Sequence, residues 1–170
     1  ELINQDNKIK FFKTHNFLGV MGGNEFTNAK NTIGAVYIIR DPRNVITSLK
    51  NHFEMSYDES FNFMKSEKKF TFDHFKKNDY SDFQFISSWE KNYQSWINNK
   101  IFPTMIIKYE DLSDKTYTVF KDLILFINKI TKSNNTFDKK KALNALSSTN
   151  FKKLKKIEEN EGFSESLNSK

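Results

Sequence analysis

The sequence predicts an α/β fold in which a parallel sheet is flanked by helices. Two continuous runs of β-branched and aromatic residues carry this prediction: residues 35–39 (A-V-Y-I-I) and 103–109 (P-T-M-I-I-K-Y). Runs of this kind are typical of strands buried on both faces. The residues between them include helical patterns long enough for a crossover, and strands joined by crossovers run parallel. The length of 170 residues predicts a single domain.

The N-terminal third contains a further predicted strand and the first predicted helix. Residues 9–13 form a short apolar and basic run that predicts a strand, and residues 21–31, with Gly22, Gly23 and several Asn, predict a loop. After residues 35–39, Asp41 is a helix N-cap and Pro42 suits the first helical position. This helix is expected to continue to about Phe53.

Residues 54–81 mix Lys with Phe, and within them we expect only a short helix over residues 59–65. Residues 82–98 predict a helix because their apolar side chains recur at helical spacing. After residues 103–109, Ser113 is expected to cap a helix that reaches Ile130. Residues 138–146 and 151–160 predict two more helices, the last of them ending before Gly162.

The composition excludes several classes of site. The chain has no Cys, which excludes disulfides, thiolate nucleophiles and Cys-based zinc sites and is compatible with a reducing, cytoplasmic compartment. Three separated His residues argue against a metal cluster. No apolar run approaches the roughly 20 residues needed to cross a bilayer, so we expect neither a metal nor a membrane partner.

Polar clusters follow all three predicted strands. They are Lys13-Thr14-His15, Arg40-Asp41-Pro42-Arg43 and Tyr109-Glu110-Asp111. In a parallel sheet, ligands bind beyond the carboxyl ends of the strands. We therefore expect these clusters to converge on one edge of the sheet and to form the functional site.

Arg40 and Arg43 are the only Arg among 27 basic residues. Arg offers a planar fork for phosphate or carboxylate that Lys cannot imitate. Arg40 ends a strand, the first turn of the next helix should present free N–H groups, and Ser48 lies about two turns along that helix. The sequence thus predicts a phosphate site without a glycine loop. Pairing of Arg40 with Asp41 or another carboxylate is the alternative.

His15 follows Lys13 at the same predicted edge. A nearby cation lowers the proton affinity of an imidazole, which suits a general base. A partly exposed His without a role is the alternative for this residue.

Five motifs, taken together and in order, resemble the cytosolic-type sulfotransferases over nearly the whole chain. The first is K-T-H at residues 13–15. The second is Y-I-I-R-D-P-R-N-V-I-T-S-L-K-N-H-F at 37–53, in which Arg40 and Ser48 have the family spacing of eight. The others are S-W-E-K-N-Y-Q-S-W at 88–96, K-Y-E-D-L at 108–112, and T-N-F with Leu154 from residue 149.

The resemblance implies a three-layer, P-loop-kinase-like α/β domain and a role for each matching residue. Arg40 and Ser48 would bind the 3′-phosphate of the sulfate donor, 3′-phosphoadenosine-5′-phosphosulfate (PAPS), which leaves as the bisphosphate PAP. Tyr109 would contact the adenine, with Thr149 and Phe151 bracketing it. His15 would take the proton of the acceptor hydroxyl or amine, and Lys13 would stabilise the transferring sulfuryl group. No metal is required for this chemistry.

Two elements of the family do not occur in this sequence: the loop Y-P-K-[SA]-G-[TN]-[TS]-W that cradles the 5′-phosphosulfate, and the C-terminal R-K-G segment. We therefore expect residues 1–170 to be a sulfotransferase domain truncated at both ends, with weak donor binding and little or no turnover alone. Asn44 and Asn150 replace the usual Asp and Ser. The acceptor is expected to be a small molecule, such as an apolar alcohol or phenol, bound by residues 19–32 and 54–81.

The main alternative is a basic nucleotide- or nucleic-acid-binding α/β module without catalysis. The net charge of +6 and the Lys pairs along the chain support it, and Phe–Lys interleaving at residues 70–77 could stack on bases. The Lys residues at 152–161 alternate with Glu, however, which is typical of a solvated helix face, so we do not expect a nucleic-acid partner. A nucleotide kinase would need a Walker A loop, which the sequence lacks.

Overall fold

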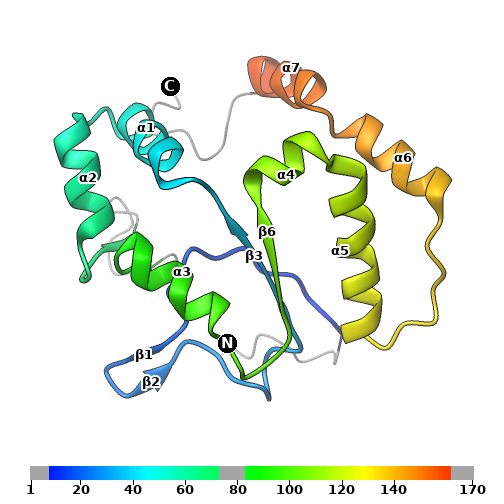
Figure 1. Cartoon of the computed structure of the whole chain (residues 1–170), viewed down its shortest axis with the longest axis horizontal. Helices are drawn as coiled ribbons and strands as arrows, with labels where there is room; N and C mark the ends of the chain where they lie inside the picture. Colours follow the sequence, from blue (N-terminus) through cyan, green and yellow to red (C-terminus); the bar gives the residue numbers. More distant parts are fainter. Residues whose placement is uncertain (1–7, 73–82, 162–170) are drawn as a thin grey trace.

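A two-stranded parallel sheet forms the centre of the molecule. The computed structural model describes residues 8–72 and 83–161. Strand β3 (Ala35–Ile39) pairs with β6 (Thr104–Lys108) over five residues, from Ala35 opposite Thr104 to Ile39 opposite Lys108. The two strands lie side by side and run in the same direction (Figure 1).

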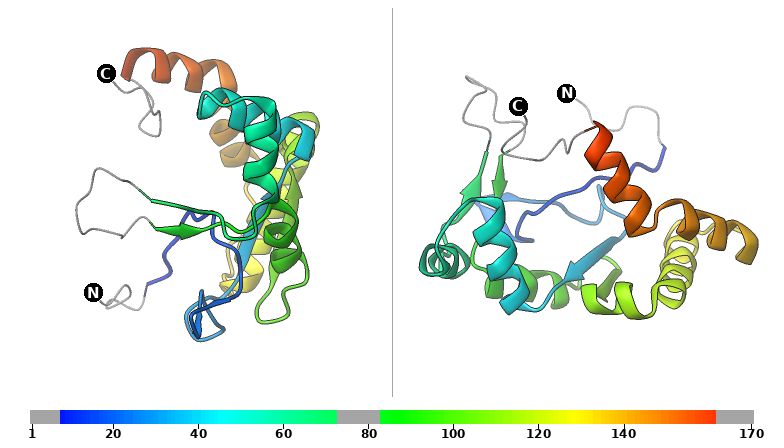
Figure 2. Two further views of the ribbon diagram at one scale, coloured as in Figure 1. Left: turned by 90° about the vertical axis from the view of Figure 1, so that its left-hand side faces the viewer. Right: turned by 90° about the horizontal axis from the view of Figure 1, so that it is seen from above.

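Helices flank this sheet, which confirms the α/β class with a parallel sheet between helices. Figure 1 shows the first three helices beside β3, α4 above β6, and α5 along the other side of β6. Further along, α6 and α7 extend beyond α5 (Figures 1 and 2). The helices are α1 (Pro42–His52), α2 (Tyr57–Lys65), α3 (Trp89–Ile97), α4 (Tyr109–Asp114), α5 (Thr116–Ile130), α6 (Lys139–Ser148) and α7 (Phe151–Glu161).

Side-chain caps define the starts of the first two helices. The Asp41 carboxylate accepts a hydrogen bond from the Arg43 N–H, and Pro42 occupies the first helical position of α1. Ser56 and Glu59 form a reciprocal capping box, so α2 begins at Tyr57, two residues before the predicted start. The predicted helices over 42–53 and 59–65 are confirmed within these bounds.

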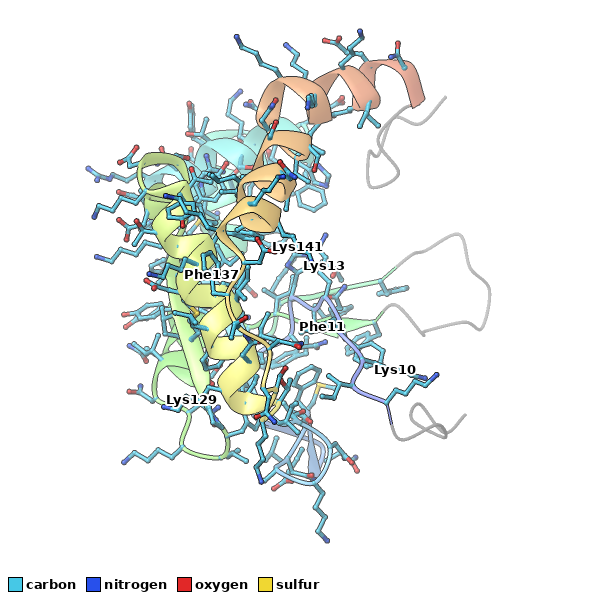
Figure 3. All side chains as sticks on the ribbon, turned by 90° about the vertical axis from the view of Figure 1, so that its right-hand side faces the viewer. Lys10, Phe11, Lys13, Lys129, Phe137 and Lys141 are labelled. Carbon is cyan, nitrogen blue, oxygen red and sulfur yellow. The ribbon has the colours of Figure 1, made fainter. Side chains whose placement is uncertain are left out.

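The predicted strand over residues 9–13 is wrong. Residues 8–17 have no strand or helix, and the side chains of Phe11 and Phe12 are 77% and 69% exposed. Lys10, Phe11 and Lys13 lie along this segment, which stands out to one side of α5 and α6 (Figure 3). A strand needs a partner backbone to complete its ladder, and the contacts described for the following residues, 15–18, are made largely with side chains instead.

The predicted helix over 82–98 is too long at its start. Strand β5 (Gln84–Phe85) pairs antiparallel with β4 (Phe70–Thr71), and α3 begins only at Trp89. Ser87 has a φ of 63°, a left-handed conformation that a helix cannot contain, and the hydroxyl of Ser88 caps α3 by accepting from the Lys91 N–H. The conformation of Ser87 and the cap by Ser88 determine where α3 begins, although the spacing of Phe85 and Ile86 predicts an earlier start.

Two smaller predictions also need correction. The predicted loop over 21–31 contains one end of a hairpin, β1 (Val20–Met21) with β2 (Asn24–Glu25), whose turn places both Gly22 and Gly23 at positive φ. Ser113 does not cap α5, because it lies inside α4. The predicted helix over 138–146 is confirmed as α6, capped by Asp138, and that over 151–160 as α7; Gly162 lies outside the described residues.

The expectation that β3 and β6 are buried on both faces is wrong as well. Trp96 of α3 stacks on Tyr37 of β3 and joins Leu18 and Phe102 in the core. Val36 and Ile38, which alternate with Tyr37 along β3, are 40% and 53% exposed. Each helix covers only part of the sheet, so the described sheet keeps apolar side chains in contact with solvent.

Strand β6 offers a matched test of this partial cover. Ile107 is 4% exposed and Ile106, on the opposite face, is 40% exposed. We expect Ile107→Ala to lower the free energy of unfolding by about 2–4 kcal/mol, because it leaves a cavity. Ile106→Ala should cost about 1 kcal/mol or less. Urea unfolding of both variants checks this, and equal losses would show that Ile106 is buried after all.

Candidate functional site

The ends of the two parallel strands bring two of the three predicted clusters together. Arg40 and Tyr109 directly follow the paired residues Ile39 and Lys108. The guanidinium carbon of Arg40 lies 4.4 Å from the centroid of the Tyr109 ring, a cation–π contact. The Asp41 N–H also donates to a Glu110 carboxylate oxygen at 3.2 Å. Side chain and backbone therefore both tie the turn after β3 to the start of α4.

Arg40 has a donor that the described residues leave unsatisfied. Its side chain is partly buried, and its Nε is fully buried without a hydrogen-bond partner among the described residues. A buried donor without an acceptor costs stability, and cationic donors cost the most. An anion bound beside Tyr109 would satisfy it, so the residues at this strand end fit a phosphate or sulfate group.

Arg43 is engaged differently. Its guanidinium is 2.5 Å from the Asp41 carboxylate, and its side chain is 86% exposed. The hydrogen bonds from Arg43 lower the pKa of Asp41 from 3.8 to about 2. Asp41 thus pairs with Arg43, and the alternative in which it pairs with Arg40 is not what the structure shows.

The start of α1 does not offer the free backbone donors that the sequence suggested. The Arg43 N–H donates to the Asp41 side chain, and the N–H groups of Asn44 and Val45 both donate to the Asp41 carbonyl at 3.0 Å. Pro42 has no N–H. The capping that begins the helix therefore uses the donors of its first turn, and the Arg40 side chain is the remaining candidate for contact with an anion at this strand end.

His15 belongs to a second cluster of hydrogen-bonded residues, in which its backbone is bound by residues of α3 and β5. Its backbone N–H donates to Gln84 Oε1 at 2.6 Å, and its carbonyl accepts from Asn92 Nδ2 at 3.1 Å. The side chains of His15 and Lys13 are exposed. Because residues 9–13 are not a strand, His15 does not reach the site as the end of a sheet strand.

The two clusters are connected through β3. The hydroxyl of Tyr37, three residues before Arg40 on the same strand, donates to Asn92 Oδ1 at 2.9 Å. Asn92 in turn holds the carbonyl of His15. His15 and Arg40 are therefore both tied to β3: His15 through Asn92 and Tyr37, and Arg40 as the residue that follows the strand.

The remaining predicted residues lie on other elements, α1, α6 and α7. Ser48 is exposed on α1, and Thr149 is the exposed C-cap of α6, its hydroxyl donating to the Ala145 carbonyl at 2.9 Å. Phe151 begins α7, and its side chain lies outside what the structure describes. Ser48, Thr149 and Phe151 thus keep their predicted roles only as proposals.

Hollows in the described residues include a small one near Gly19 and a larger one near β6. One, of about 70 Å³, is lined by apolar parts of Leu18, Gly19 and Ile101. It is smaller than the cavity of about 150 Å³ that accommodates a benzene ring. The other is an open groove of about 390 Å³ between β6 and α5, next to the turn that carries Tyr109. Its lining is Met105, Ile106, Ile107, Lys108, Asp111, Val119 and Asp122.

Sequence reasoning missed Asn92 and Tyr37 as site residues. The available signal was an Asn in the apolar pattern of a helix, between Trp89 and Trp96, where a polar side chain needs partners. Within residues 8–72 and 83–161, no group of three or more His, Asp or Glu could hold a metal ion. None of the helices in that part of the chain is long and apolar enough to cross a bilayer.

Comparison with known families gives one finding that covers both clusters. The family model described as the sulfotransferase domain matches residues 1–170. A search of curated proteins found no match.

The Asp41–Arg43 pair predicts a pH dependence of stability. Because the pKa of Asp41 is lowered on folding to about 2, its stabilisation is present above its ordinary pKa and is lost as pH falls through the folded value. Asp41→Asn keeps an oxygen that accepts from the Arg43 N–H but cannot ionise. We expect this variant to lose stability less steeply than the wild type between about pH 4 and pH 2, measured by urea unfolding.

Arg43→Ala should flatten the same part of the pH profile, because Arg43 is the main cause of the lowered pKa. An unchanged slope in both variants would contradict the assignment.

Proposed function

The chain belongs to the sulfotransferase family, and from that premise we propose that it transfers a sulfuryl group from PAPS to the hydroxyl or amine of a small-molecule acceptor. The observation that carries this proposal is the buried, unsatisfied Nε of Arg40 beside Tyr109 at the carboxyl end of the sheet. A cationic donor that lacks an acceptor in that position suits the phosphate of a nucleotide donor.

On the donor side, Arg40 binds the 3′-phosphate and Tyr109 contacts the adenine. Tyr109 holds the guanidinium at 4.4 Å from its ring, which limits the rotamers of Arg40 before the nucleotide arrives. Glu110 adds a second restraint, because it binds the Asp41 N–H and fixes the turn that carries Arg40. In this proposal Ser48 adds a hydroxyl to the phosphate, and Thr149 and Phe151 bracket the base.

On the acceptor side, His15 is the general base. Its imidazole is exposed while its backbone is held at both the N–H and the carbonyl. His15 takes the acceptor proton as the acceptor oxygen forms its bond to sulfur, and the bond from sulfur to the 5′-phosphate oxygen breaks to release PAP. Lys13 stabilises the negative charge on the sulfuryl oxygens. The protein contributes positioning and electrostatic stabilisation.

The acceptor class and the compartment remain proposals. A small apolar alcohol or phenol fits the aromatic residues around α1 and α2, where Phe53 stacks on Phe63 at 5.6 Å. The hollow of about 70 Å³ beside residue 19 is too small for an aromatic ring as it stands, which favours the residues around Phe53 as the acceptor site. A cytoplasmic location is proposed from the absence of Cys alone.

The nucleic-acid alternative has less support from the described contacts. Lys69 lies 3.9 Å from the Phe63 ring centroid and Lys65 lies 5.1 Å from that of Phe61. These rings are therefore already engaged by Lys residues of the same chain. Part of the Phe–Lys segment at 70–77 lies outside the described residues.

The two Arg residues give a matched test of the donor site. We expect Arg40→Ala to weaken the binding of PAP by about tenfold to a hundredfold, because it removes a charge-assisted contact. Arg43→Ala removes the same charge three residues away and should change the affinity by less than about threefold, because that side chain is exposed and paired with Asp41. Isothermal titration with PAP measures both.

Equal losses in the two variants would mean that net charge rather than a site binds PAP. A steep salt dependence of binding to any oligonucleotide, with no saturable binding of PAP, would favour the nucleic-acid alternative.

A second pair tests the base. Radiolabelled PAPS makes even the low turnover expected of residues 1–170 measurable. We expect His15→Gln to lower that rate of transfer to a simple phenol by about a hundredfold to ten-thousandfold, the usual contribution of a general base. His52→Gln is the comparison: its ring lies 4.6 Å from Phe53, beside the proposed acceptor site, so this variant should change the KM for the phenol rather than kcat. Turnover that His15→Gln leaves unchanged would remove His15 from the mechanism.

A further inference from the structure

Asn92 is a buried polar residue in the middle of α3, with 9% of its surface exposed. Its amide nitrogen donates to two carbonyls, that of Ile86 at 2.7 Å and that of His15 at 3.1 Å. Its amide oxygen accepts from the Tyr37 hydroxyl at 2.9 Å. Asn92 therefore joins three separate segments of the chain through its side-chain hydrogen bonds.

Asn92 belongs to a polar stripe on α3 that holds residues 15–18. Asn92, Ser95 and Trp96 share one helix face, since they are three and four residues apart. Trp96 Nε1 donates to the Asn16 carbonyl at 3.0 Å, and the Ser95 hydroxyl oxygen accepts from the Leu18 N–H at 3.0 Å. The helix thus binds backbone groups of His15, Asn16 and Leu18.

Residues of strand β5 also form hydrogen bonds with residues 15–17. Gln84 Oε1 accepts from the His15 N–H at 2.6 Å, and the Phe17 N–H donates to the Phe85 carbonyl at 2.8 Å. The Phe85 N–H donates to Asn16 Oδ1 at 2.7 Å. The segment after Lys13 is therefore fixed without being a strand of the central sheet.

Among these partners, Asn92 also reaches the strand that carries Arg40. Burial raises the pKa of Tyr37 to about 12, so its hydroxyl keeps its proton and donates. The carbonyls of Ile86 and His15 can only accept, so they fix which end of the Asn92 amide is nitrogen, and the oxygen then accepts from the Tyr37 hydroxyl. The orientation of one amide thereby sets the distance between the backbone of His15 and β3.

We propose that Asn92 is a positioning residue for His15, holding its backbone at a fixed place relative to β3 and thus to Arg40. This inference rests on the proposed function of His15 as the base. Asn92 does not touch the reacting atoms. It acts by keeping the imidazole within reach of an acceptor placed beside the donor, and misplacement of about 1 Å can cost about a hundredfold in rate.

The experiment compares two substitutions on the same helix face. Asn92→Asp keeps the size and the acceptor for Tyr37 but replaces the donor to His15 with an oxygen. We expect it to lower kcat for transfer from PAPS to a phenol by about tenfold to a hundredfold, with the KM for PAPS unchanged. Ser95→Ala frees the Leu18 N–H and leaves the His15 carbonyl bound, so its kcat should stay within about threefold of the wild type.

Asn92→Ala is a second variant without a buried charge, and thermal unfolding followed by circular dichroism establishes that each variant is folded. Loss of kcat in the folded Asn92 variants but not in Ser95→Ala supports the proposal. Equal kcat in all folded variants overturns it.

A measurement independent of turnover uses the imidazole signals of His15 and His52 in proton NMR titrations. We expect the Asn92 variants to change the chemical shift of the His15 imidazole protons while leaving those of His52 unchanged. An unchanged His15 signal overturns the positioning role. A shifted signal together with turnover that is the same in the wild type and in His15→Gln supports the positioning by Asn92 and instead contradicts the proposed base.

Discussion

The parallel pairing of β3 with β6 is the constraint on which the rest of the structure depends. Its register sets Ile39 opposite Lys108, so the next residues, Arg40 and Tyr109, leave the sheet side by side and in contact. A slip of one residue would turn every side chain of one strand to the other face. The Arg40 guanidinium would then lose its contact with the Tyr109 ring. The hydrogen bond from the Asp41 N–H to the Glu110 carboxylate would be lost as well.

Helix α3 serves residues 15–18 as a neighbouring strand otherwise would. Its side chains, together with those of β5, bind the backbone groups that a ladder would bind. Side chains can do this at only a few points, which explains why the segment before them, around Phe11 and Phe12, is exposed. The same arrangement links function to packing, because Asn92 and Trp96 also contact Tyr37, one through its hydroxyl and the other through its ring.

The two Arg residues carry the same chemical group but have different local partners. The Asp41 carboxylate, which caps α1, binds Arg43, and this contact lowers the pKa of Asp41 to about 2. Arg40 keeps a buried nitrogen for which the described part of the chain supplies no acceptor. One capping interaction thus neutralises Arg43, uses the first backbone donors of α1, and leaves Arg40 as the group available to an anion.

The sequence alone determined the elements whose signals are local. The two apolar runs predicted β3 and β6, Asp41 and Pro42 predicted the start of α1, and the ordered motifs around Arg40, Tyr109 and His15 predicted the family that the domain match shows. These succeed because caps, periodicity and motif spacing depend on residues close along the chain. The prediction that Arg40 and Tyr109 meet also followed from the sequence, since parallel strands end at one edge.

Only the tertiary structure decided what depends on distant partners. Residues 9–13 have the composition of a strand but no paired backbone among the described residues, and Val36 and Ile38 have the composition of a core but are only partly covered there. Which Arg is paired, and how Asn92 joins His15 to Tyr37, depend on side chains brought together from far apart in the chain. Hydrogen bonds require contact within about 3 Å, and only the folded chain establishes which groups come that close.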